Sequence, residues 1–234
     1  MAGFKTIFKR IERKYVMSTD KYEALMADIS EWLYPDDFPH GTVSSMYLDT
    51  PSFLLIRNSI DAKKYKEKLR VRGYNEINGD SKVFLEIKKK LMGIVYKRRV
   101  AVTLEQAMDY IYNRVKPVDS QIMNEIDYAM NLYGWPQPAA VVSYERDAYK
   151  IKNHKHLRLT FDTQVRCRFT DPTLDAGNHG EEVLPSDRVI MEFKTDGAMP
   201  LWLSAALDKH QIYPTSFSKY GTAYKKQICN VKDL

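Results

Sequence analysis

Polar and apolar side chains alternate along residues 65–102, which makes this segment the clearest structural signal in the chain. In its first part, Lys68, Arg70 and Arg72 occupy every second position, and apolar residues stand between them. Successive side chains of a strand point to opposite faces of the sheet. The spacing therefore predicts a strand with one cationic face and one apolar face.

Two further strands of the same kind follow in this segment. Glu86 and Lys88 share one face of the second strand, and Lys97 and Arg99 share one face of the third. Asn78-Gly79-Asp80 has the composition of the turn that joins two antiparallel strands. The segment predicts a sheet whose polar face is densely cationic and contains a carboxylate.

The same alternation recurs outside this segment. Further strands are predicted at residues 7–16, 43–49, 139–149, 155–163 and 188–195, and helices at 20–33, from Thr103, at 119–132 and at 200–210. Pro35 and Pro39 indicate a loop after the first helix. Ser18, Thr19 or Asp20 can cap that helix, and Glu23 suits a capping box with Asp20. Thr103 with Gln106 predicts a second capping box.

Two interpretations of the cationic faces compete: a half-solvated sheet, or a closed sheet with the charges inside. Arginine and tyrosine are frequent on these faces, and a carboxylate recurs singly at Glu12, Glu86, Asp162 and Glu192. Helices need the apolar faces for packing, and about eight antiparallel strands can close around one small ligand. We therefore expect an α+β fold, an antiparallel eight-stranded β-barrel tunnel with helices packed outside, in a single domain over residues 1–234.

The overall charge favours an anionic partner. The 234 residues carry a formal net charge of +6, which suits nucleic acid, anionic lipid or a phosphorylated small molecule. The charge is spread along the chain without a basic tail, and no compact aromatic platform accompanies it, so nucleic acid is the weakest of these partners. Two cysteines without metal-ligand spacing, no signal-like N-terminus and no long apolar run predict a reduced, cytoplasmic protein.

Several catalytic motifs are absent from the sequence. It has no phosphate-binding glycine loop, no HExxH zinc motif and no kinase catalytic loop. His154 and His156 form an isolated pair on one predicted strand, which is more typical of a surface than of a metal site. Arginines and lysines around phosphates, with a carboxylate to hold a divalent cation, would instead provide the electrostatics of phosphoryl transfer.

The predicted strands contain segments that resemble a known family. These are RIERKY, YLDT, KLRVRGY, FLEIKKK, VYKRRV, SYERDAY, LRLTFD, MEFK and SFSKY, in this order along nearly the whole chain. Together they resemble the VTC domain, the polyphosphate polymerase family within the triphosphate tunnel (CYTH-like) superfamily. The resemblance implies a tunnel with a basic interior, in which the γ-phosphate of ATP is transferred to a growing polyphosphate chain with Mn²⁺ or Mg²⁺.

The resemblance also assigns roles to residues of this chain. The implied catalytic residues are Arg70, Arg72, Lys88, Arg146, Arg158 and Lys194. The implied substrate-binding residues are Lys14, Lys97, Arg99, Tyr144, Ser218 and Lys219, and the implied metal ligand is Glu192. The implied partners are ATP and inorganic polyphosphate, without nucleic acid, and any link to a membrane is expected through a separate membrane protein.

One departure from the superfamily pattern bears on the reaction. Its triphosphatases carry ExExK near the N-terminus, whereas this chain has Arg10, Glu12 and Lys14 on the equivalent face. The exchange of a carboxylate for a cation favours transfer to phosphate over transfer to water. Two alternatives stay open: a hydrolase of tripolyphosphate or nucleoside triphosphates, and a polyphosphate-binding module without turnover.

Overall fold

The structure is a computed structural model that describes residues 7–62, 64–195 and 197–230. The side chains at positions 7–10 and 155 lie outside that description. The strands are β1 (Ile7–Ser18), β2 (Leu33–Asp49), β3 (Tyr65–Tyr74), β4 (Lys82–Leu91), β5 (Ile94–Thr103), β6 (Gln137–Ile151), β7 (His154–Arg168), β8 (Glu181–Glu182) and β9 (Arg188–Thr195). The helices are α1 (Thr19–Ile29), α2 (Leu54–Asp61), α3 (Leu104–Asn113), α4 (Gln121–Leu132), α5 (Leu201–Lys209) and α6 (Lys219–Ala223).

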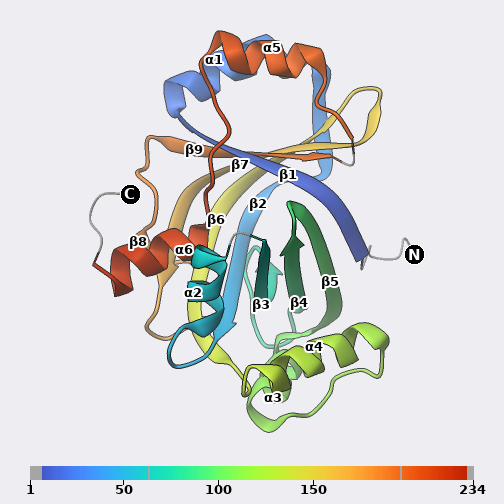
Figure 1. Ribbon diagram of the computed structural model, residues 1–234, viewed down its shortest axis with the longest axis vertical. Coiled ribbons are helices and arrows are strands. Elements are labelled where there is room, and N and C mark those ends of the chain that lie inside the picture. The colour runs from blue at the N-terminus through green and yellow to red at the C-terminus, as the bar shows by residue number, and fades with distance from the viewer. Residues whose placement is uncertain (1–6, 63, 196, 231–234) are drawn as a thin grey trace.

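Eight of these strands form a closed antiparallel ring (Figure 1). Their order is β6-β2-β3-β4-β5-β1-β9-β7, and β7 pairs back with β6, while the short β8 adds to β7. Alternating side chains of a closed sheet must point either into the ring or out of it. The predicted eight-stranded arrangement is therefore confirmed, and the pattern in the sequence becomes an inner and an outer face.

Helices cover the outer face at opposite ends of the view in Figure 1. Leu69, Leu85 and Val100 pack under α3 and α4, whereas Leu159 and Phe193 pack under α1 and α5. Burying a large aliphatic or aromatic side chain stabilises a fold by roughly 1.5–3 kcal/mol. The two apolar clusters hold the outer face against its helices, so the polar residues at alternate positions face inward.

A third apolar cluster lies on the inner side. Val43, Tyr47, Val142 and Tyr144 belong to it and contact α6 and Ile56 of α2. The inner face is thus apolar and covered on one side, and polar elsewhere. This division limits where a charged ligand could bind.

One local prediction for the N-terminal part is wrong, one is confirmed for one of its candidates, and one further along is confirmed. Pro35 and Pro39 lie inside β2 and not in a loop; Pro35 stands opposite Tyr149, and Pro39 falls in the register shift between Pro35 and His40, which accommodates a residue lacking an N–H group. Ser18, one of the three predicted candidates, caps α1, and its side chain accepts a hydrogen bond from the Lys21 N–H; Asp20 lies in the first turn, so the Asp20–Glu23 pair is not the cap. The predicted Thr103–Gln106 capping box is present at the start of α3.

Candidate functional site

A buried carboxylate gathers cations from neighbouring strands on the inner face. Glu86 on β4 is 1% exposed, and its Oε2 accepts hydrogen bonds from Arg70 Nε at 2.8 Å and Nη2 at 2.6 Å. Its Oε1 lies 3.4 Å from Lys97 Nζ. Burial opposes the charged form, but Arg70 and Lys97 outweigh it and hold the pKa of Glu86 well below its usual range. Glu86 therefore orients these two cations as a permanent anion.

Tyr47 and Ser45 on β2 complete this cluster. Tyr47 Oη accepts a hydrogen bond from Arg70 at 3.4 Å, and Ser45 Oγ accepts one from Arg72 at 3.0 Å. Burial raises the pKa of Tyr47, but the charges of Arg70, Lys68 and Arg72 outweigh burial and lower it to about 7. The positive charges of these side chains therefore stabilise negative charge on an oxygen beside them.

A second buried carboxylate organises the opposite wall. Asp162 on β7 is fully buried and accepts two hydrogen bonds from Arg146 on β6, at 2.6 and 2.8 Å. Lys219, at the start of α6, also donates to Asp162 and lies 4.2 Å from the centroid of the Tyr144 ring. Planar pairing of a guanidinium with both carboxylate oxygens fixes its orientation. Arg146 is therefore held in place before any ligand arrives.

Glu192 on β9 lies next to this wall. Its Oε2 is 3.1 Å from Lys194 Nζ and 3.8 Å from Arg146 Nη2. Burial disfavours its charge, but Lys194, Lys14 and Lys88 outweigh burial and keep its pKa well below the usual range. Cations from four strands thus surround one carboxylate.

Glu12 on β1 provides another carboxylate beside Glu192. It accepts a hydrogen bond from Lys88 at 2.7 Å, and the charge of Glu192 acts against its own ionisation. Residues 12 and 194 are paired across β1 and β9, so Glu12 and Glu192 are diagonal neighbours on one face, with Cα atoms about 7–8 Å apart.

These two carboxylates can be tested as ligands for the divalent cation that the sequence resemblance implies. Mg²⁺ commonly binds to one or two carboxylates together with water and substrate phosphates. Glu12 and Glu192 meet that requirement on β1 and β9, although Lys88 and Lys194 now occupy one oxygen of each. No cluster of three or more His, Cys, Asp or Glu side chains occurs among the described residues. The donors fit a cation held jointly by protein and phosphate.

The segment before α6 contacts the inner cations. Lys14 Nζ donates to the Phe217 carbonyl at 2.8 Å, and Lys68 Nζ donates to Ser218 Oγ at 2.8 Å. Burial lowers the pKa of Lys68 to about 7, and the nearby charges of Lys14 and Lys88 add to the effect. The charge of Lys68 is thus sensitive to a bound anion.

Most of the predicted site residues meet on the inner face. They form two groups around the buried carboxylates. Around Glu86 lie Arg70, Arg72, Lys97 and Arg99, and around Glu192 and Asp162 lie Lys14, Lys88, Arg146, Lys194 and Lys219. Between the two groups lie Tyr144, Lys68 and Ser218. Arg99 lies over the Phe84 ring, 4.1 Å from its centroid. Arg158 differs, because its guanidinium pairs with Asp36 and its side chain is 42% exposed.

Sequence reasoning underestimated two residues. Asp162 was recognised as an inner carboxylate but not as the anion that holds Arg146 and Lys219. Tyr47 stands in the alternating pattern of β2, yet the sequence offered no sign of its contact with Arg70. Asp49, at the end of β2, accepts backbone N–H groups at the start of α2 and a hydrogen bond from the Tyr220 hydroxyl.

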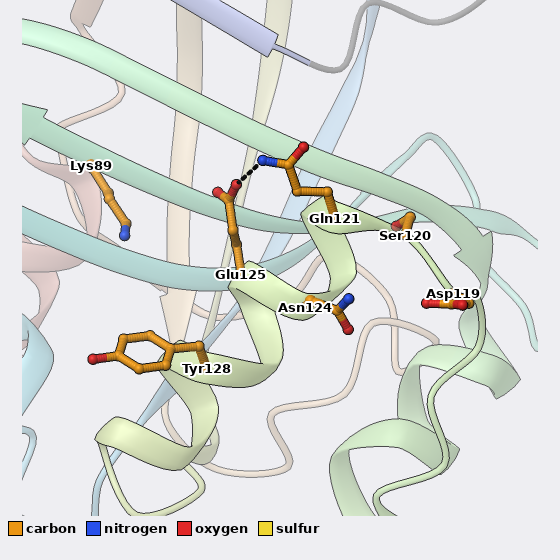
Figure 2. A pocket seen from close by; sticks show the side chains of 7 residues that line it. All are labelled: Lys89, Asp119, Ser120, Gln121, Asn124, Glu125 and Tyr128. Atoms are coloured by element: carbon orange, nitrogen blue, oxygen red, sulfur yellow. Dashed lines mark hydrogen bonds between the residues drawn. The ribbon is translucent and has the colours of Figure 1, made fainter.

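A surface depression on the outer face is not part of this site (Figure 2). It is lined by Lys89, Asp119, Ser120, Gln121, Asn124, Glu125 and Tyr128. Gln121 donates to Glu125 at 3.3 Å, and Glu125 also pairs with Arg98 on the outer face of β5. The Arg98–Glu125 pair joins α4 to the sheet, whereas the Gln121–Glu125 contact lies within the helix.

Two other predictions concern the histidine pair and membrane-spanning segments. His154 and His156 are both exposed on β7, and neither belongs to a described metal-ligand cluster. Among the described residues, no helix has both the length and the apolar character needed to cross a membrane.

Comparison with known proteins adds the family and the fold. The profile described as the VTC domain matches residues 9–228. A candidate adenylate cyclase from Bacillus halodurans superposes with a TM-score of 0.55 at 12% identity, covering 92% of this chain and 96% of that one. A candidate adenylyl cyclase from Hippeastrum, described as having a dominant triphosphatase activity, superposes with a TM-score of 0.57 at 15% identity, covering 93% and 95%. A search of curated proteins found no significant match.

Proposed function

Because this chain belongs to the VTC domain family, we propose that it is a metal-dependent polyphosphate polymerase. It would transfer the γ-phosphate of ATP to a growing chain of inorganic polyphosphate. The observation that carries the proposal is the convergence of arginines and lysines from most strands of the ring on one enclosed face. The cations outnumber the carboxylates there, so the face needs an anionic ligand.

The electrostatics of the inner face favour a chain of phosphates over a single anion. Arg70 and Arg146 stand on different strands, β3 and β6, and each is held by its own buried carboxylate. Like charges at close range repel strongly where water is limited, and a polyanion between them relieves that repulsion. The planar fork of arginine also matches phosphate oxygens. A linear polyphosphate could contact both arginine clusters at once.

The proposed step is an in-line transfer between phosphates. A terminal oxygen of the polyphosphate chain forms a bond to the γ-phosphorus of ATP. The bond from that phosphorus to the bridging oxygen breaks, and ADP leaves with the electron pair. The attacking oxygen is already ionised, so no base is required to remove a proton. The presence of Arg10 in place of a carboxylate is consistent with this requirement.

The inner residues would have different roles in the transfer. Arg70, Arg72 and Arg146 would spread the negative charge that develops on the transferred group. Lys88 and Lys194 would bind phosphate oxygens once they leave Glu12 and Glu192. These two carboxylates would hold the divalent cation, which supplies charge neutralisation at the phosphates.

Substrate binding would involve the remaining inner residues. Lys14, Lys97 and Arg99 would contact phosphates further along the chain, and Tyr144 would lie near the nucleotide. Ser218 and Lys219 would add contacts from the segment at α6. Arg158 would bind only where the ligand reaches the edge of the ring, because it now pairs with Asp36.

A triphosphatase is the second function with specific support. The Hippeastrum protein shares the fold and is described as having a dominant triphosphatase activity. Hydrolysis differs in one chemical requirement, because water must lose a proton as it attacks. The four inner carboxylates, Glu12, Glu86, Asp162 and Glu192, are already paired with lysine or arginine, which makes them poorly suited to accept it.

The test is incubation of the protein with ATP and Mn²⁺, followed by phosphorus NMR of the products. We expect long-chain polyphosphate to accumulate, with one ADP released for each phosphate that is added to the chain. Orthophosphate with ADP would instead support the hydrolase, and binding without turnover would support a polyphosphate-binding module. Glu125→Gln, on the outer face, is the control variant. The single-domain organisation over residues 1–234, the cytoplasmic location and a separate membrane partner stay predictions.

A further inference from the structure

Two lysine pairs stand in register on the inner faces of β3 and β4. Lys68 is paired with Lys88, and two residues further along each strand Lys66 is paired with Lys90. The register between the strands is continuous from Tyr65 to Arg72. Since side chains alternate without interruption, Lys66 and Lys90 face the same side as the inner lysines.

Lys66 and Lys90 are called the outer pair here because they lie nearer the end of the strands. They differ from the inner pair, Lys68 and Lys88, in their partners. Lys88 donates to Glu12 and Lys68 donates to Ser218. By contrast, no salt bridge or side-chain hydrogen bond within the described part of the chain involves Lys66 or Lys90. Like charges directly opposite each other in a sheet are destabilising. This pair therefore does not serve the stability of the ring.

The position of the outer pair is accessible. A two-residue step along a strand covers about 6.5 Å, so the outer pair lies that much closer to the β4–β5 turn at Met92 and Gly93. Lys66 is half-buried and Lys90 is exposed. In Figure 1 this turn is the free end of the β4–β5 hairpin, below β1. A ligand extending past Lys68 and Lys88 would meet the outer pair next.

We infer that Lys66 and Lys90 form a rim site that binds distal phosphates of a polyphosphate chain whose reacting end lies deeper in the ring. The identity of the ligand rests on the proposed function, whereas the site rests on the register and charge of β3 and β4. A short ligand held at the buried arginines would not reach the rim site. The rim site would therefore select for chain length.

The experiment compares two ligands and two double variants. Binding of long-chain polyphosphate and of tripolyphosphate is measured by calorimetry across a range of salt concentrations, without ATP. The test variant is Lys66→Gln with Lys90→Gln. The matched control is Lys89→Gln with Lys116→Gln, which removes two charges from the outer surface.

We expect the rim variant to weaken long-chain binding about fivefold to thirtyfold, as for two accessible ion contacts. Its plot of log affinity against log salt should become shallower by about 1.4, the value for two contacts with a flexible polyanion. Tripolyphosphate affinity should stay within about twofold of wild type, and the control should change neither ligand by more than that. An equal loss for both ligands, or no loss for the long chain, would overturn the rim site.

These results also separate the rim site from the proposed reaction. Length-dependent binding that is lost in the rim variant, in a protein that makes no polymer from ATP, would retain the rim site and reject the polymerase. Polymer synthesis with unchanged binding in the rim variant would retain the polymerase and reject the rim site. Failure of the wild-type protein to bind polyphosphate would reject both.

Discussion

Replacement of Glu86 by glutamine tests whether the arginine clusters depend on buried anions. Glu86 is 1% exposed and accepts both short hydrogen bonds from Arg70, at 2.8 and 2.6 Å, with Lys97 at 3.4 Å. Glutamine has nearly the same shape but no charge. The substitution therefore leaves the buried Arg70 guanidinium without its counter-charge.

The expected cost follows from the burial of this ion pair. Removing one partner of a buried, hydrogen-bonded pair typically destabilises a protein by about 3–5 kcal/mol. For a chain of this length, each kcal/mol lowers the melting temperature by about 2–4 °C. We expect Glu86→Gln to melt roughly 6–20 °C below the wild type.

Thermal unfolding by circular dichroism provides the measurement, with Glu125→Gln as the matched control. Glu125 pairs with Arg98 at 2.9 Å, and both side chains are about one-third exposed, so its loss should cost less than about 1 kcal/mol. Tripolyphosphate should raise the melting temperature of Glu86→Gln more than that of wild type, because the anion replaces the missing charge. Equal melting temperatures for the two variants would refute the role assigned to Glu86.

The same residue predicts a direction for acid sensitivity. The pKa of Glu86 is depressed in the folded state relative to its usual value. Its contribution to stability is present above the unfolded pKa and is lost as the pH falls through the folded pKa. Wild type should lose stability on acidification more steeply than Glu86→Gln.

Three further predictions concern ligand binding and turnover. Burial lowers the pKa of Lys97 to about 6 and of Lys68 to about 7, so affinity for tripolyphosphate should fall as the pH rises from 6 to 8; an affinity that does not change would contradict this. Glu192→Gln should reduce turnover by at least about 100-fold and weaken its dependence on Mn²⁺, whereas unchanged metal dependence would exclude Glu192 as a ligand. Arg146→Ala should reduce turnover far more than Arg158→Ala, since Arg146 pairs with Asp162 and lies near Glu192, whereas Arg158 pairs with Asp36; equal losses in kinetic assays would show that Arg158 reaches the substrate.

The sequence by itself determined which side chains share a face. The spacing of Lys68, Arg70 and Arg72, and of Glu86 and Lys88, follows from the two-residue period of a strand, which is a local property. The capping box at Thr103 is local in the same sense. These features could be predicted because they depend on residues only a few positions apart.

Only the tertiary structure decided which charges pair. Lys88 meets Glu12 across 76 positions of sequence, and Lys14 meets the carbonyl of Phe217 across 203. The same holds for Arg158, whose alternation placed it with the inner cations but whose guanidinium pairs with Asp36. Closure of the ring and the register between its strands bring such residues together, and neither is encoded in the spacing of any single strand.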